Sequence, residues 1–243
     1  MNTEKLQAIV LSTIDYGDSD RIASLFTLER GRIKAFARGA RKSQKRFGPA
    51  LETFARINTQ IRVKDEGLST LQQADIVSIY PAIRGNLHRI AHAIYACELV
   101  DAMTPEGHPL PRLYRLLTAR LERLEEEAAI EEDRRFFEIN LLNILGYRPP
   151  LENCSRCEAP FGNTGAFQQQ SGEPVCPACT NSGRQIKAET LRSLQACLGT
   201  GRFGAVSFPV ESLVQAGLLL DDAIAAHTVR QIKSLEFLRQ VNL

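Results

Sequence analysis

The stretch that decides the fold of the N-terminal part is Arg21–Arg38, which reads RIASLFTLERGRIKAFAR. Its first half is an apolar run that includes Ile22, Leu25 and Phe26. In its second half, Lys34 and Phe36 alternate with small or apolar residues, and Gly31 lies between the halves. Alternation with a period of two is typical of a half-buried β-strand. The stretch therefore predicts two strands joined by a turn at Gly31.

Further strand-like segments flank this hairpin. Residues 8–11 form a short apolar run, and the apolar segments at 57–63 and 68–79 are separated by a Lys-Asp-Glu-Gly turn. Several short strands with tight turns between residues 7 and 80 predict a small barrel or sandwich.

Beyond Pro81 the apolar residues recur at helical spacing, which predicts helices near 82–103, 113–124 and 131–145. Helical spacing resumes near Lys187, after Pro209 and over 227–241. We therefore predict an α+β fold in which a small β-barrel precedes a helical domain with an embedded four-cysteine element. The expected boundaries are 1–80 for the barrel, 81–150 for the first helical part, 151–183 for the cysteine element and 184–243 for the second helical part.

The chain has 243 residues and a net charge of only +2, but its charge is unevenly distributed. Residues 1–80 hold 13 Lys and Arg against 9 Asp and Glu, whereas residues 81–150 hold 9 against 11. No run of about 18 apolar residues occurs, so no membrane span is expected. The short apolar run near the N-terminus does not resemble a signal peptide, which favours a cytoplasmic protein.

Four of the six cysteines form two close pairs. The spacing is Cys154-x2-Cys157, 18 residues, then Cys176-x2-Cys179. Four thiolates about 2.3 Å from one ion complete the tetrahedral shell of zinc, and this gap is usual for paired four-cysteine sites. The glycine-containing stretch between the pairs suits a short hairpin. Two disulfides, four buried thiols and iron are less favoured interpretations.

The chemistry of the cluster favours one structural zinc ion and argues against an enzyme. No His occurs in residues 151–183, whereas a catalytic zinc usually keeps an open position beside His or Glu ligands. No phosphate-binding loop is present either. Two other classes remain open: a nuclease using Asp15, Asp18 and Asp20, and a zinc-ribbon transcription or adaptor factor.

Positive residues crowd into residues 30–46 without an intervening acid. A block of one sign favours an anionic partner such as the closely spaced phosphates of a nucleic acid. A mobile basic loop without a partner is the alternative. Phe36 and Phe47 could stack on bases, as in barrels that bind single strands, but each could equally be a core residue.

Several of these segments resemble the RecO family of recombination mediators. The N-terminal signature is matched by residues 17–22, which read GDSDRI, by residues 29–42, which read ERGRIKAFARGARK, and by residues 46–54, which read RFGPALETF. Leu145-Gly146-Tyr147-Arg148-Pro149 before the first cysteine pair is similar to the family's helix-to-zinc junction, and Lys233-Ser234-x2-Phe237-Leu238 to its C-terminal signature.

The resemblance implies an OB-fold barrel, a helical domain and a zinc finger. It also implies binding to single- and double-stranded DNA, annealing of complementary strands, and loading of recombinase onto strands coated by single-strand-binding protein. The implied protein partners are RecR and the acidic tail of single-strand-binding protein. The implied location is the cytoplasm, in association with the nucleoid.

The family's DNA surface maps onto seven cations of this sequence: Arg32, Lys34, Arg38, Arg41, Lys42, Lys45 and Arg46. The acidic tail requires a cation beside an apolar groove, and Arg135, near Phe137 and Leu141, is the candidate. An equally good interpretation is that Arg135 pairs with Glu131 or Glu138, one helical turn away.

Overall fold

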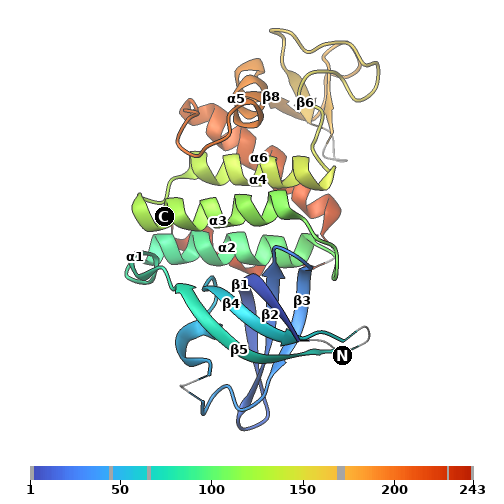
Figure 1. Cartoon of the computed structure of the whole chain (residues 1–243). Coiled ribbons are helices and arrows are strands. Elements are labelled where there is room, and N and C mark those ends of the chain that lie inside the picture. The colour runs from blue at the N-terminus through green and yellow to red at the C-terminus, as the bar shows by residue number, and fades with distance from the viewer. Residues whose placement is uncertain (1–2, 44–45, 65–66, 169–172, 229, 242–243) are drawn as a thin grey trace. The chain divides into compact units, whose positions relative to one another are not determined.

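The computed structural model describes residues 3–43, 46–64, 67–168, 173–228 and 230–241 (Figure 1). The chain divides into two compact units. The first comprises residues 1–128 together with 232–243, and the second comprises residues 129–231.

The first unit begins with a closed five-stranded barrel. Its strands are β1 (Thr3–Tyr16), β2 (Asp20–Thr27), β3 (Gly31–Ala37), β4 (Arg56–Arg62) and β5 (Ser69–Ser78). They neighbour one another in the order β1-β2-β3-β5-β4, and only β3 and β5 are parallel. This is the five-stranded Greek-key arrangement of an OB-fold. The predicted α+β class, the barrel and the hairpin around Gly31 are confirmed.

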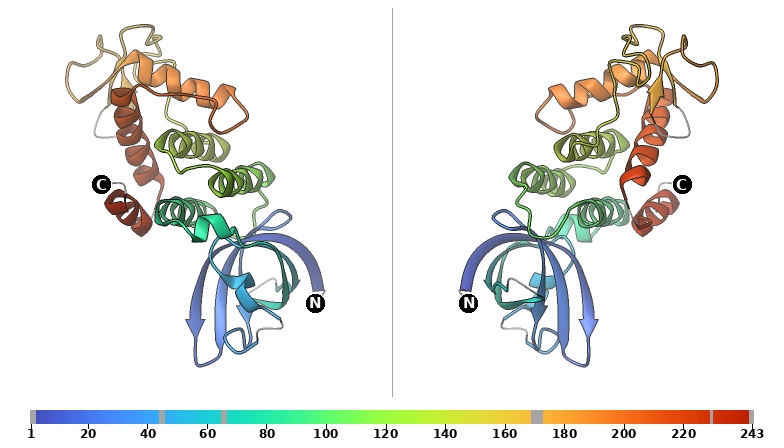
Figure 2. Two further views of the ribbon diagram at one scale, coloured as in Figure 1. Left: turned by 90° about the vertical axis from the view of Figure 1, so that its left-hand side faces the viewer. Right: turned by 90° about the vertical axis from the view of Figure 1, so that its right-hand side faces the viewer.

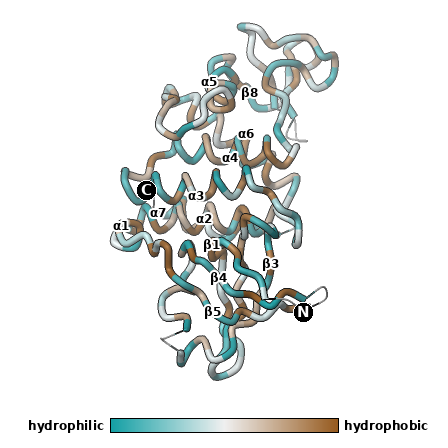
Figure 3. The backbone as a smooth tube through the Cα atoms, viewed as in Figure 1, coloured by the Kyte–Doolittle hydropathy of each residue, from teal (hydrophilic) through white to brown (hydrophobic). Residues whose placement is uncertain are grey.

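Small and medium-sized apolar side chains fill the barrel. Ala8, Ala23 and Ala35 are fully buried in its wall, and Ile57 and Ile61 reach inward from β4. Hydrophobic and hydrophilic residues are interspersed along the strands (Figure 3), as expected when one face of each strand points into a core. A short 3₁₀-helix, η1 (Gly48–Leu51), adds Ala50 and Leu51 to this core.

Strand β1 is much longer than the apolar run 8–11 suggested. Its first half pairs with β4 and its second half with β2, and the register with β2 shifts between Val10 and Ser12. Such a bulge reverses which residues of the strand face inward. Val10 pairs with buried Leu25 inside the barrel, whereas beyond the bulge Ile14 pairs with Ile22 on the outer face.

The described part of the first unit also contains the helices α1 (Pro81–Arg84), α2 (Leu87–Met103), α3 (Pro111–Glu126) and α7 (Lys233–Val241). The periodicity predicted one helix from residue 82 to 103, but the structure interrupts it after Arg84. Asn86 caps α2, because its side chain accepts a hydrogen bond from the Arg89 backbone N–H. The preference of Asn86 for the N-cap position therefore starts a new helix here, although the apolar residues keep helical spacing across both helices.

Helix α7 is far from α2 in sequence but packs against it (Figure 2). The Glu98 carboxylate of α2 accepts hydrogen bonds from the backbone N–H groups of Lys233 and Ser234, at 3.1 and 2.7 Å. These N–H groups belong to the first turn of α7, which has no partner for them within the helix. A carboxylate there also complements the positive end of the helix dipole.

The second unit contains α4 (Glu131–Leu145), α5 (Ala188–Gly199) and α6 (Val210–His227). It also holds a small sheet with strand order β7-β6-β8, formed by Pro174–Val175, Ala166–Gln168 and Arg184–Ile186. Gly146 ends α4 in the left-handed conformation, which agrees with the predicted end of this helix near residue 145. No helix among the described residues is long and apolar enough to cross a membrane.

Candidate metal centre and nucleic-acid interface

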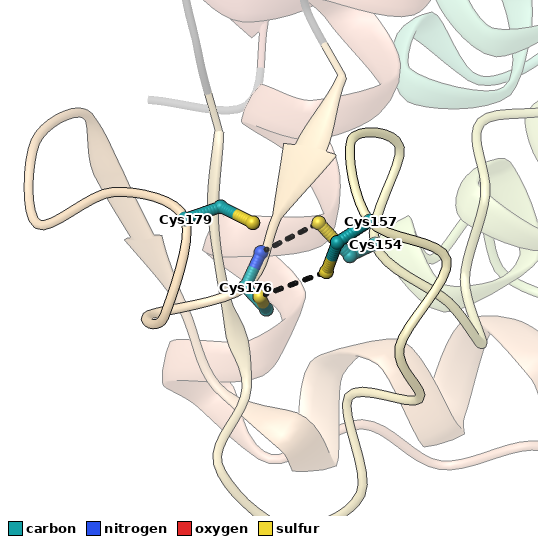
Figure 4. Close-up of side chains that lie close together, drawn as sticks. All are labelled: Cys154, Cys157, Cys176 and Cys179. Carbon is teal, nitrogen blue, oxygen red and sulfur yellow. Dashed lines mark hydrogen bonds between the residues drawn. The ribbon is translucent and has the colours of Figure 1, made fainter.

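The four paired cysteines converge in the second unit. Their sulfur atoms all lie within 4.8 Å of one another (Figure 4), and the sulfurs of Cys157 and Cys176 are 3.6 Å apart. A tetrahedron with metal–sulfur bonds of about 2.3 Å has edges of about 3.8 Å. The cluster therefore has the size and the donor set to hold one metal ion.

Two turns and a hairpin build this cluster. The backbone N–H of Glu158 donates to the Cys154 carbonyl, and that of Cys179 donates to the Cys176 carbonyl, so each pair closes a tight turn. Strands β6 and β7 lie between the pairs and are antiparallel, which confirms the predicted hairpin. Ser155 joins the first turn to β7 through a hydrogen bond from its backbone N–H to the Pro174 carbonyl.

Backbone N–H groups also point at the sulfur of Cys154. Those of Arg156 and Cys176 lie 3.4 and 3.3 Å from it. Burial raises the pKa of this thiol, but these donors outweigh burial and lower the pKa to about 6. Hydrogen bonds with the Cys157 and Cys176 thiols instead raise the pKa of Cys179 to about 12. Holding all four as thiolates therefore requires a cation at their centre.

The other two cysteines are separate from the cluster. Cys97 and Cys197 are fully buried on helices of different units, and burial raises the pKa of both thiols. Within the described residues, the four clustered cysteines form the single group of three or more His, Cys, Asp or Glu that could hold a metal ion.

The predicted basic residues occupy two neighbouring regions of the barrel. Arg38, Arg41, Lys42 and Arg46 lie in or next to the loop between β3 and η1, here called the basic loop (residues 38–47, of which 38–43 and 46–47 are described). All four are exposed. Lys45 lies outside the described residues. The backbone N–H of Arg41 donates to the Ser19 carbonyl, which joins the basic loop to the β1–β2 turn at the end of the barrel away from α2 (Figure 1).

The charges of the basic loop are only weakly neutralised. Arg41 contacts Asp15 at 3.6 Å. Arg46 donates to the Arg38 carbonyl at 2.8 Å and lies over the ring of Phe47. Among the residues that the structure describes, no carboxylate pairs with Arg38, Lys42 or Arg46. Three guanidinium or ammonium groups are thus available to an anion at this end of the barrel.

Arg32 and Lys34 lie further along β3 and share one carboxylate oxygen. Atom Oε1 of Glu106, in the α2–α3 connection, is 3.2 Å from both cationic groups. Arg32 also donates to the Thr104 carbonyl at 2.9 Å and is mostly covered, whereas Lys34 is half exposed. These residues line a groove of about 580 Å³ together with Arg30 and Lys64. Glu106 is a groove residue that its sequence context, an ordinary loop, did not reveal.

The two phenylalanines considered for base stacking have different environments. Phe47 is 2% exposed and belongs to the barrel core. Phe36 lies on the outer face, half-buried, where Tyr16 meets its ring edge-on at a centroid distance of 5.8 Å. Tyr16 was missed in the sequence because the bulge in β1 places it outside the barrel, where simple alternation from Leu6 and Ala8 would have placed it inside.

Two acidic residues near the β1–β2 turn stabilise this turn and the basic loop. Asp15 pairs with Arg21 at 3.0 Å, and Asp20 accepts a hydrogen bond from the Gly39 backbone N–H at 2.7 Å. They belong to the first unit, whereas the cysteine cluster belongs to the second. Two of the three carboxylates considered for a nuclease centre therefore have structural partners.

Arg135 lies in a buried network within the second unit. It is 7% exposed, and its guanidinium donates to Glu138 at 2.7 Å and to Glu131 at 2.9 Å. A Cβ atom on Gly217 of α6 would lie 2.6 Å from Nη2 of this guanidinium, so α6 approaches it closely. This geometry favours the pairing interpretation of Arg135 and argues against a site open to a peptide tail.

A closed barrel with a basic end, joined to helices and a four-cysteine cluster, places the chain among OB-fold proteins that carry a metal-binding element. Residues 1–80 match the family model for the N-terminal part of recombination protein O, and residues 84–236 match the model for its C-terminal part. The chain belongs to the RecO family of DNA repair proteins.

Several DNA repair proteins match this chain over at least 97% of its length. The DNA repair protein RecO of Pelobacter propionicus is 64% identical, with 100% of this chain and 98% of that protein covered. The RecO proteins of Geobacter sulfurreducens and Myxococcus xanthus are 51% and 37% identical, and at least 97% of each chain is covered.

Proposed function

We propose that this protein is a recombination mediator in DNA repair. It binds single- and double-stranded DNA through the basic loop and the neighbouring groove cations Arg32 and Lys34. It anneals complementary strands and helps to load recombinase onto strands coated by single-strand-binding protein. The observation that carries the proposal is that Arg38, Lys42 and Arg46 are exposed at one end of an OB-fold barrel and have no carboxylate partner among the described residues.

Annealing requires no catalytic group. Two complementary strands repel each other because each carries a dense line of phosphates, and bound cations lower that repulsion. The protein is therefore proposed to act stoichiometrically, without nucleotide hydrolysis and not as an enzyme. The proposed place of action is the cytoplasm, on the nucleoid.

The cysteine cluster is proposed to hold one structural zinc ion. Four thiolates leave no open coordination position, which suits a stabilising site more than a reactive one. Support comes from the fit between the sulfur separations and a tetrahedral zinc–sulfur shell. When bound, zinc would join the two cysteine turns to the β6–β7 hairpin.

RecR and the acidic tail of single-strand-binding protein are the proposed protein partners. The earlier candidate for the tail, Arg135, could receive a peptide carboxylate only if Glu131 or Glu138 released it. Because both hydrogen bonds are short and Glu138 is fully buried, exchanging the bond to Glu138 for a peptide carboxylate carries a desolvation cost for the carboxylate left behind. The support for these partners is the family relationship.

Annealing of complementary oligonucleotides, followed without ATP, tests the proposal directly. The protein should accelerate pairing, and charge reversal at Lys34, Arg38 and Arg41 should abolish most of the acceleration. An unchanged rate in that variant would show that DNA binds elsewhere.

Salt dependence gives an independent test of the DNA surface. If about five cations contact phosphates of a single strand, log K falls against log salt with a slope near −3.5. Replacing Arg38 and Lys42 by Ala should reduce that slope by about 1.4, which is two phosphate contacts. Arg112 and Arg115, exposed on α3, give the matched control, because their replacement makes the same charge change and should leave the slope near the wild-type value.

A further inference from the structure

The outer face of β2 and β3 changes character along its length. At the end near the helices, Phe26 is fully buried and packs near Tyr114 of α3, with ring centroids 6.2 Å apart. One step along, the Ser24 hydroxyl donates to Asp101 of α2 at 2.6 Å, and Lys34 pairs with Glu106. Elements of the same unit therefore cover the first half of this face.

The other half of the face is open and apolar. Ile14 on β1 pairs with Ile22 on β2, which pairs with Phe36 on β3, so the three side chains form a row across the strands. Tyr16 extends the row and contacts Phe36. Ile14 is 66% exposed and Tyr16 is 58% exposed, while Ile22 and Phe36 are half-buried. These four residues are called the outer platform.

The cations around the outer platform indicate what covers it. Arg38 follows Phe36 by two residues and is exposed, and Arg41 contacts Asp15, the residue before Tyr16. Arg41 also donates to the carbonyl of Gly17, the residue after Tyr16. An apolar or aromatic surface edged by cations complements a ligand that has flat rings and negative charges together. Unpaired nucleotides have this combination, since their bases stack on aromatic rings while their phosphates contact cations.

We propose that the outer platform binds unpaired bases of single-stranded DNA, with Tyr16 and Phe36 as the stacking residues. The proposal rests on the function proposed above and specifies the form of DNA that this surface prefers. In a duplex the bases are stacked on one another and paired, so they do not reach the platform. The basic loop therefore serves both forms of DNA, whereas the outer platform contributes to binding of the single strand alone.

The first test compares two DNA forms with one exposed substitution. Tyr16→Ala should weaken binding of oligo(dT) by roughly fivefold or more, the loss expected for one stacked base. Binding of a duplex of equal length should change less than twofold, and the salt slope should stay constant because no phosphate contact is removed. Tyr147→Ala, an exposed tyrosine of the second unit, is the control and should affect neither.

The second test measures the stacking of bases on the outer platform directly. The chain contains no tryptophan, so Tyr16→Trp provides a single indole reporter at the outer platform. Its fluorescence should be quenched by oligo(dT) and not by the duplex. Tyr147→Trp should be quenched by neither.

The outcomes separate the two proposals. If Tyr16→Ala binds oligo(dT) as well as the wild type and Tyr16→Trp is not quenched, while the Arg38 and Lys42 double variant is impaired, the platform assignment is overturned and the proposed function stands. If the wild-type protein binds neither form of DNA, the proposed function fails, and the platform fails with it.

Discussion

At the scale of single residues, Glu106 places a carboxylate between two cations of the proposed DNA surface. One of its oxygens contacts both Arg32 and Lys34, which line the groove of about 580 Å³ described above. Glu106→Gln should therefore tighten DNA binding by up to about fivefold, because exposed ion pairs contribute about 0.2–1 kcal/mol. Fluorescence anisotropy with a labelled oligonucleotide at low salt measures this change.

A second carboxylate separates the local effect of Glu106 from net charge. Glu122 on α3 is similarly exposed and pairs with Arg56 at 2.7 Å, away from the groove lining. Glu122→Gln changes the net charge by the same amount and should have a much smaller effect. Equal tightening in both variants would show that Glu106 does not compete with DNA.

Two buried tyrosines give the protein a sensitivity to alkaline pH. No hydrogen-bond partner for the hydroxyl of Tyr80 or of Tyr114 is found among the described residues, and burial raises the pKa of each to about 12. The neutral phenols stabilise the fold fully below the unfolded-state pKa of about 10. This contribution is lost as the pH rises through about 12, because the unfolded chain ionises first.

Tyr114→Phe should remove part of that alkaline loss. At pH 7.5 the urea midpoint should stay the same or rise slightly, since an unpartnered buried hydroxyl is removed. At pH 11 the variant should be more stable than the wild type. Tyr147→Phe, at an exposed site, is the control, and a loss of stability in Tyr114→Phe at both pH values would show that the hydroxyl has a partner.

At the scale of elements, the β2–β3 turn and the α2–α3 connection meet at Gly31. This glycine has a φ of +67°, and a Cβ atom on it would lie 1.9 Å from the His108 carbonyl oxygen. The neighbouring Arg32 carbonyl accepts a hydrogen bond from the Gly107 backbone N–H at 2.9 Å. Backbone contacts thus hold the α2–α3 connection, which carries Glu106, beside β3. These contacts leave no room for a side chain at position 31.

Gly31→Ala should destabilise the first unit by clearly more than the roughly 1–2 kcal/mol that a left-handed conformation alone costs. Gly17→Ala is a matched control, since Gly17 has a φ of +58° and a Cβ atom there would meet nothing within 4 Å. Urea unfolding of both variants measures the difference. Equal losses of unfolding free energy in the two variants would show that the backbone near His108 shifts to accommodate the new side chain.

The structure follows from the sequence most directly where the pattern is local. The hairpin around Gly31, the helix that begins at Glu131 and the cysteine turns follow from spacing and turn chemistry over short windows. The bulge in β1 was missed, and with it Tyr16, because a one-residue shift in register depends on what two partner strands require. The interruption after Arg84 was missed because its apolar residues keep helical spacing across the break.

The candidate site shows the same division. The four cysteines were identified from spacing, and the basic loop from uninterrupted charge. Glu106 could not be identified, since its role depends on two cations more than 70 residues away. Phe36 and Phe47 could not be distinguished, because both are aromatic residues in a basic segment and tertiary contacts alone decide which is buried.

At the scale of the whole molecule, the four-cysteine cluster and the proposed DNA surface belong to different units. Removing zinc should therefore destabilise the second unit by several kcal/mol, since a structural zinc contributes its binding free energy to folding. Cys154→Ser should lose bound zinc, measured by mass spectrometry of metal content, and should lower the melting temperature of the second unit. Oligonucleotide affinity at low temperature should change little.

Cysteine controls make this prediction specific. Cys97→Ala removes a thiol that lies outside the cluster and should retain one zinc ion per chain. A stable Cys154→Ser protein with full zinc content and selective loss of DNA binding would reverse the assignment of a structural role.

The packing of α7 against α2 has a consequence for synthesis of the protein on the ribosome. The partners in this contact, Glu98 and the start of α7, are separated by 135 residues of chain. The barrel strands and α2 leave the ribosome long before α7 does, so the surface of α2 that α7 covers stays uncovered while the entire cysteine-bearing unit is translated. The unit that contains the barrel is thus completed by a helix that is made after the second unit. A nascent chain halted after α6 carries a barrel beside an α2 helix whose α7-facing surface is exposed.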